Sequence, residues 1–166
     1  LSPIGAANSA LILSFAMSAF FTYLLVRRLL AASGLPPFTI AAAAFCAGMA
    51  FGFAPYRVGQ LSHLQVLTTQ WMPLALLGMH GYLADGRRRW LALTAFAWVV
   101  QALSNGYYLI FFPVLVAVWF AWFVGFGRQW RRGAVLLASY AAASLLLLPG
   151  LLQYLMVHQQ LGLERH

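Results

Sequence analysis

Residues 6–28 have the sequence AANSALILSFAMSAFFTYLLVRR, an apolar run that ends on a pair of arginines. A helix of about 20 mostly apolar residues is long enough to cross the hydrocarbon core of a bilayer. Similar apolar runs, several of them ending close to arginine, recur along the rest of the chain. This pattern predicts an all-α protein, an integral membrane helical bundle.

The apolar runs predict six transmembrane helices within residues 1–150. The expected spans are residues 6–26, 38–53, 66–83, 90–103, 107–125 and 134–148. Pro149-Gly150 is expected to break the last span, because proline removes a helix amide and glycine tolerates turns. Residues 151–166 mix apolar groups with glutamine and histidine, so we expect an interfacial amphipathic helix or the start of an outer segment. Because the chain begins at Leu1, we expect it to be a fragment of a longer protein.

Composition supports a membrane protein. Hydrophobic residues make up 63% of the chain and charged residues only 7%, whereas a soluble domain carries roughly 25% charged residues. The formal net charge of +8 does not indicate a nucleic-acid partner. Such a partner requires a basic face on a folded surface, and these arginines stand at the ends of apolar segments, where they would meet membrane lipid.

The arginines also predict an orientation. The chain has no lysine, and eight of its ten arginines fall in three clusters. The clusters are Arg27–Arg28, Arg87–Arg88–Arg89 and Arg128–Arg131–Arg132. Six alternating spans put all three clusters on one side, and the positive-inside rule makes that side cytoplasmic. Arg57, Asn105 and the C-terminal tail are then expected outside.

Polar side chains gather on the expected outer side. Polar groups at bilayer depth are costly unless they pair or line a wet cavity, so an outward-facing cleft is one interpretation. The alternative is loops that meet water, with tyrosines forming an interfacial belt. Arg57 fits either a phosphate ligand or a cation that snorkels to lipid headgroups. His63 fits either a base or hydrogen-bond donor or a residue that faces water.

Several kinds of chemistry are not expected. The chain has no GxGxxG or Walker loop, and its lone Cys46 excludes an internal disulfide. Its only acids are Asp85 and Glu164, so an autonomous proton pump is not expected. No metal site or cofactor is evident, and the use of a divalent cation stays open. Pro73 lies inside the expected third span, where it would free the carbonyl of Thr69.

Four short motifs follow one another along the chain: FAPYR at 53–57, HLQ at 63–65, QWMPL at 70–74 and QALSNGYY at 101–108. As an ordered set they resemble bacterial membrane proteins of the GT-C glycosyltransferase class. The resemblance covers almost the whole chain. It implies a multi-span helical enzyme that uses polyprenyl-phosphate-linked sugars on the non-cytoplasmic face of the bacterial inner (plasma) membrane.

The resemblance also implies a substrate site but not a catalytic residue. The catalytic acid of such enzymes commonly lies in their first large outer loop, which on the expected topology would precede Leu1. The resemblance makes Arg57 the candidate for the carrier phosphate. Five further residues would shape the cavity: Tyr56, His63, Gln65, Asn105 and Tyr107. A lipid-linked-sugar transporter or flippase, or a non-catalytic membrane scaffold, remains the alternative function.

Overall fold

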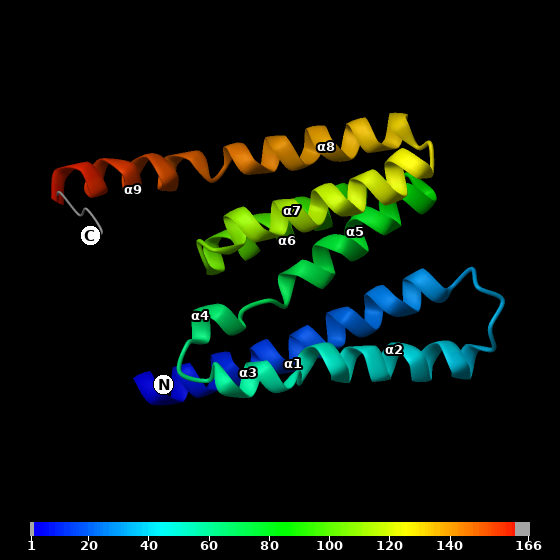
Figure 1. Ribbon diagram of the computed structural model, residues 1–166, viewed down its shortest axis with the longest axis horizontal. Coiled ribbons are helices and arrows are strands. Elements are labelled where there is room, and N and C mark those ends of the chain that lie inside the picture. The colour runs from blue at the N-terminus through cyan, green and yellow to red at the C-terminus, as the bar shows by residue number, and fades with distance from the viewer. Residues whose placement is uncertain (1, 162–166) are drawn as a thin grey trace.

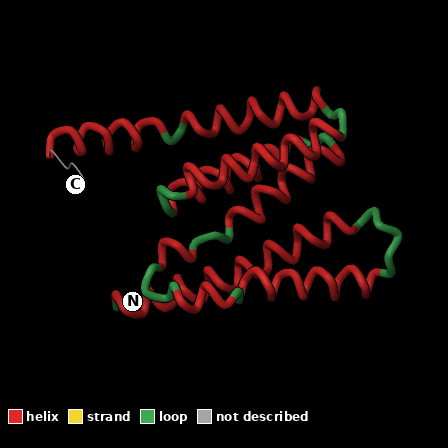
Figure 2. The backbone as a smooth tube through the Cα atoms, viewed as in Figure 1, coloured by secondary structure: helices red, strands yellow, loops and turns green. Residues whose placement is uncertain are grey.

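The computed structural model describes residues 2–161, and every regular element within them is helical (Figures 1 and 2). The predicted all-α class is therefore confirmed. The elements are α1 (Pro3–Leu30), α2 (Pro37–Gly52), α3 (Pro55–Gly59), α4 (Leu64–Leu67), α5 (Trp71–Asp85), α6 (Arg88–Ser104), α7 (Tyr108–Phe120), the π-helix η1 (Ala121–Phe126), α8 (Trp130–Leu145) and α9 (Leu148–Leu161).

Within residues 2–161, three helical runs are long and apolar enough to cross a membrane. They are α1, residues Pro37–Gly59 and residues Tyr108–Phe126, and the bent pair α8 and α9 would make a fourth. The six expected spans are thus not confirmed. The shortfall lies in α5 and α6, which have 15 and 17 residues and extend only about 22–26 Å at 1.5 Å per residue.

Helix α5 lies at the centre of the bundle. It packs between α1 and α6 and also contacts α8, and Figure 1 shows α1, α2 and α3 forming a layer on one side of it. Nine of its 15 residues are buried, compared with three of 16 in α2. The outer helices instead expose large apolar side chains such as Phe38, Phe45 and Ile110. Such a distribution suits a bundle whose outer surface meets lipid.

Glycines allow the helices to approach closely. A Cβ on Gly48 would lie 2.5 Å from the carbonyl oxygen of Ala19, and one on Gly52 would lie 2.7 Å from the Cβ of Ala19. These two glycines are four residues apart on one face of α2, as in the small-residue motifs that bring membrane helices together. On α5, a Cβ on Gly78 would meet Thr94 of α6. Close packing therefore joins α2 to α1 and α5 to α6.

We expect Gly48→Ala to destabilise the protein, because the added methyl group meets the backbone of α1. Overpacking of this kind costs about 1–3 kcal/mol, measured as a lower unfolding midpoint by circular dichroism in detergent. Gly59→Ala is the control, because no atom lies within 4 Å of a Cβ added at Gly59. Equal midpoints for the two variants would contradict the close contact between α1 and α2.

The start of the C-terminal helix differs from the prediction. The chain bends by 44° between α8 and the Leu148–Tyr154 part of α9. Pro149 and Gly150 lie in the first turn of α9 instead of forming the break. Proline is tolerated there because first-turn amides have no partner within the helix. Residues 162–166 of the expected interfacial segment fall outside the described residues, and the orientation of α9 on a membrane stays a prediction.

Candidate functional site

A break in the helical path separates α4 from α5. Residues 68–70, here called the α4–α5 break, are not in an α-helix. The prediction of one span over 66–83 with a kink at Pro73 is wrong in this respect. Pro73 instead occupies the first turn of α5, where its missing N–H costs nothing. The carbonyl oxygens of residues 65–68 have no helical partner at the break. They need other hydrogen-bond donors if they lie at membrane depth.

Side chains from other helices bind each carbonyl oxygen from Gln65 to Thr68. The Gln65 oxygen accepts from Asn105 Nδ2 at 3.0 Å, and the Val66 oxygen accepts from the Tyr108 hydroxyl at 2.7 Å. The Leu67 oxygen accepts from Ser14 Oγ at 2.5 Å and from the Arg57 guanidinium at 3.0 Å. The Thr68 oxygen accepts from Gln101 Nε2 at 2.7 Å. The donors come from α1, α3, α6, α7 and the turn between α6 and α7.

Arg57 is the central donor of this network, and only 1% of it is exposed. Besides Leu67, its guanidinium donates to Thr69 Oγ1 at 2.6 Å and to Ser14 Oγ at 3.1 Å. The ring of Phe15 lies 4.5 Å below the guanidinium carbon. Arg57 thus joins α3 to α1, to the end of α4 and to the α4–α5 break.

No carboxylate balances the charge of Arg57 within the described residues. The partners are neutral oxygens, and Nε has no hydrogen-bond partner. The side chain also lines none of the described cavities. Its predicted contact with a carrier phosphate stays a prediction, and Arg57 would have to leave these partners to make it.

The other candidate residues lie at the same end of the bundle. Tyr56 is 57% exposed. The exposed imidazole of His63 lies with Nδ1 3.0 Å from Ser62 Oγ. Gln65 exposes its side chain while its backbone oxygen binds Asn105. This last bond joins α4 to the turn between α6 and α7.

Asn105 and Tyr107 also border a pocket. Asn105 Oδ1 accepts from the Tyr107 backbone N–H at 3.0 Å, which fixes the turn between α6 and α7. The pocket, of about 830 Å³, lies between this turn and the α8–α9 junction. It is lined by Ala102, Leu103, Asn105, Gly106, Tyr107, Leu109, Ile110, Leu147, Gly150, Leu151 and Tyr154. Its walls are therefore mostly aliphatic, with an amide and two phenols among them.

The sequence reasoning did not single out Ser14, Gln101 or Tyr108 as site residues. A signal for Ser14 exists, because Ser14, Ser18 and Thr22 repeat every four residues in an otherwise apolar helix. That spacing puts them on one helical face, and all three are buried. A buried polar stripe on α1 indicates that this face meets protein, as it does at Leu67.

The opposite end of the bundle brings the three arginine clusters together. We call it the arginine end: the C-terminal ends of α1 and α5 and the N-terminal ends of α6 and α8. Arg28 and Arg87 lie 3.7 and 3.8 Å from Asp85 Oδ2, and Arg132 donates to the carbonyl of Leu83. The Trp90 indole N–H donates to Asp85 Oδ2 at 3.0 Å. This bond is the largest of the effects that hold the pKa of Asp85 below its usual value, and the nearby arginines add to it.

Comparisons with known proteins add no family assignment. No family model, no curated protein and no solved structure matches the chain. Within residues 2–161, no three His, Cys, Asp or Glu side chains come together in a possible metal site.

We expect Arg57→Ala to lower the free energy of unfolding by about 1.5–3 kcal/mol, the range for hydrogen bonds to a charged group. Arg57→Lys should recover only part of the loss, because an ammonium lacks the planar fork of a guanidinium. Arg88→Ala removes an equal charge from an exposed position and is the control. Thermal unfolding in detergent, followed by circular dichroism, measures all three. If Arg57→Ala is as stable as the wild type, Arg57 does not stabilise the contacts of α3 with α1 and the α4–α5 break.

Proposed function

We propose that the chain is the membrane-embedded part of a GT-C-type glycosyltransferase. In this proposal the pocket between the α6–α7 turn and α9 receives a polyprenyl-phosphate-linked sugar. The enzyme transfers the sugar to a glycan, lipid or protein acceptor on the non-cytoplasmic face. The pocket is the observation that carries the proposal, together with the motif resemblance at residues 53–57, 63–65, 70–74 and 101–108.

The chemistry of the pocket suits such a carrier. Its volume of about 830 Å³ lies within the range of roughly 300–1,000 Å³ typical of ligand sites. Aliphatic residues such as Leu109, Ile110 and Leu151 would contact the isoprenoid chain. Asn105 offers an amide, and exposed Tyr107 offers a ring and a hydroxyl, which are groups that bind sugars or phosphate oxygens. A purely hydrophilic substrate would make no apolar contact with the aliphatic walls.

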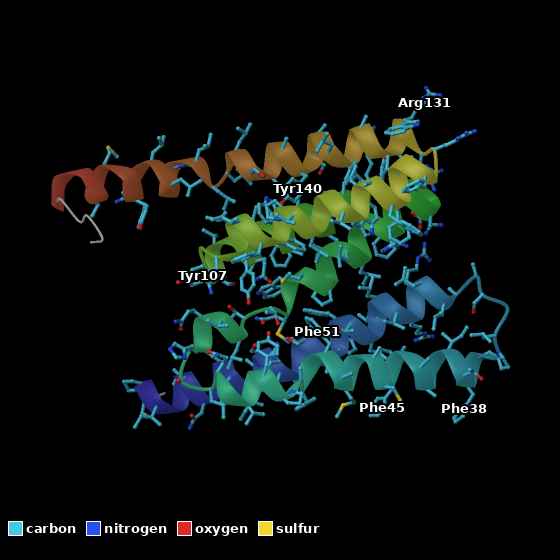
Figure 3. The ribbon with its side chains drawn as sticks, viewed as in Figure 1. Phe38, Phe45, Phe51, Tyr107, Arg131 and Tyr140 are labelled. Atoms are coloured by element: carbon cyan, nitrogen blue, oxygen red, sulfur yellow. The ribbon has the colours of Figure 1, made fainter. Side chains whose placement is uncertain are left out.

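The membrane arrangement forms part of the proposal. We infer six spans, with α5 and α6 crossing as short helices inside the bundle, and place the arginine end in the cytoplasm by the positive-inside rule. Tyr107 and Arg131 lie at opposite ends of the bundle (Figure 3). The pocket then faces the outer leaflet of a bacterial plasma membrane, where lipid-linked sugars would reach it.

The buried Arg57 supports the site indirectly in this proposal. Its guanidinium donates hydrogen bonds to the Leu67 oxygen and to the Thr69 hydroxyl. The nearby Gln65 oxygen accepts a hydrogen bond from Asn105, which lines the pocket. The exposed side chains of Tyr56, His63 and Gln65 would face the sugar or the acceptor. The catalytic residue is not assigned to any residue of this chain.

The second candidate function is a lipid-linked-sugar transporter or flippase. Two interrupted helical paths favour it, at the α4–α5 break and at the bend between α8 and α9, because transporters often build their binding sites from broken helices. A flippase would move a fluorescent lipid-linked sugar across a liposome without forming a glycosylated product. A glycosyltransferase would release the polyprenyl phosphate as the sugar is transferred.

We expect bulky residues at the glycines of the pocket to block carrier binding. An added Cβ at Gly106 or Gly150 meets no atom within 4 Å, so a phenylalanine at either position would occupy the pocket without a clash at Cβ. Gly106→Phe and Gly150→Phe should therefore weaken binding of a polyprenyl phosphate by about tenfold or more, the equivalent of 1.4 kcal/mol or more. Native mass spectrometry of the purified chain measures this binding.

Gly59→Phe is the matched control for the pocket variants. An added Cβ at Gly59 also meets no atom within 4 Å, but Gly59 does not line the pocket. Its affinity for polyprenyl phosphate should equal that of the wild type. Unchanged binding by both pocket variants, or an equal loss in Gly59→Phe, would reject the pocket as the carrier site.

The proposed orientation predicts which single cysteines an impermeant maleimide can reach in intact cells. In a Cys46→Ala background, cysteines at Gln60 and Gly106 should react. Cysteines at Ala84 and Gln129 should react only after the membrane is permeabilised. Labelling of intact cells at Ala84 would reverse the orientation and move the pocket to the cytoplasmic side.

A further inference from the structure

The arginine end carries a large excess of positive charge. It combines eight arginines with Asp85, the one acidic side chain among residues 2–161. Asp85 already contacts Arg28, Arg87 and the Trp90 indole. Seven positive charges are thus left for anions from outside the described chain. The three clusters are far apart in the sequence, so the fold itself creates this concentration of charge.

A groove opens at the arginine end between α1, α5 and α6. It has a volume of about 380 Å³ and is lined by Leu24, Arg27, Arg28, Ala31, Leu77 and Trp90. Leu77 lies eight residues before Asp85, so the groove extends about 12 Å along α5 from the charged rim. A second groove of about 300 Å³ separates α1 from α2 and shares Arg27 and Ala31 with the first. Arg27 therefore stands on the ridge between two grooves.

The two arginines of the first groove differ in their partners. Arg28 lies 3.7 Å from Asp85, and its guanidinium carbon lies 5.6 Å from the Trp90 ring centroid. The side chain of Arg27 is exposed and has no hydrogen bond or ion pair with any of residues 2–161. Trp90 forms a fixed wall, because its ring lies against Gly81, where a Cβ would overlap it. Arg27 is thus the cation of the groove that is open to a ligand.

We propose that this groove binds an anionic phospholipid. The headgroup phosphate pairs with the guanidinium of Arg27, in the two-pronged geometry that arginine favours for phosphates. One acyl chain lies along Leu24 and Leu77 beside the Trp90 ring. A soluble phosphate would leave these apolar walls exposed, whereas a phospholipid has the charge at its headgroup and the hydrocarbon below it.

The excess charge also selects the type of headgroup. A zwitterionic phospholipid carries its own cation, which the remaining arginines would repel. An anionic headgroup has no such cation, and basic pockets between membrane helices bind lipids of this type. The site is separate from the proposed carrier pocket, because the two lie at opposite ends of the bundle and share no lining residue.

The test compares phosphatidylglycerol with phosphatidylcholine of identical acyl chains, bound to the purified chain in detergent and measured by native mass spectrometry. The wild type should bind phosphatidylglycerol more tightly. Arg27→Gln should weaken phosphatidylglycerol binding by about tenfold, the loss expected for one charge-assisted pair, and leave phosphatidylcholine binding unchanged. Ala31→Trp keeps every charge but fills the groove, so it should also weaken phosphatidylglycerol binding.

Arg131→Gln is the matched control. It removes the same charge from the same end, but Arg131 lines neither groove, and Figure 3 shows it at the start of α8. Its affinity for phosphatidylglycerol should match that of the wild type. An equal loss in Arg131→Gln would overturn the proposal in favour of diffuse charge attraction. Displacement of phosphatidylglycerol by millimolar inorganic phosphate would overturn it in favour of a simple anion site.

Discussion

The interaction on which the described structure most depends is the capping of four consecutive carbonyl oxygens at residues 65–68. When a helix ends at membrane depth, its last carbonyl groups have no water to bind. Here donors from distant helices replace the water, and Arg57 and Ser14 share the oxygen of Leu67. A buried unsatisfied carbonyl costs about 1–3 kcal/mol, so the α4–α5 break is stable only where these helices converge. The same bonds that satisfy the backbone thereby hold α1, α3, α6 and α7 around it.

This network also explains how the bundle tolerates a buried cation without an acid. A guanidinium needs several oxygen acceptors, and here one carbonyl oxygen and two hydroxyl groups supply them instead of a carboxylate. Thr69, Ser14 and Leu67 provide three acceptors, and Phe15 covers the face of the guanidinium. The cation and the break are therefore complementary. Each would be costly alone at membrane depth, and Arg57 satisfies the Leu67 oxygen while Leu67 and Thr69 accept two of its hydrogen bonds.

The parts of the fold that could be predicted from sequence follow from local rules. Apolar length and arginine position predict the all-helical class and the approximate ends of several helices, and alternation predicts that the arginine clusters share one end. The break could not be predicted in this way. Residues 66–83 are apolar enough to suggest one helix, and Pro73 suggests a kink within it, whereas the structure uses Pro73 to begin α5. The deciding factor is the supply of distant donors such as Tyr108 and Gln101, which no local pattern reveals.

The candidate site also combines features that follow from the sequence with features that depend on distant residues. That Asn105 would approach the segment around Gln65 follows from topology, because both stand at the same end of alternating helices. The burial of Arg57 does not follow, since the sequence is compatible with either a phosphate ligand or a cation at lipid headgroups, and neither is a buried guanidinium. Asn105 lines the pocket and also binds the Gln65 oxygen, so the pocket shares a residue with the carbonyl network. The Gln65 oxygen also accepts a hydrogen bond from the Thr68 hydroxyl at 2.7 Å. A ligand that drew the Asn105 amide away would leave the Thr68 hydroxyl as the one side-chain donor to that oxygen among the described residues. The pocket and the carbonyl network thus share one side chain, through which a ligand at the proposed site would act on the network.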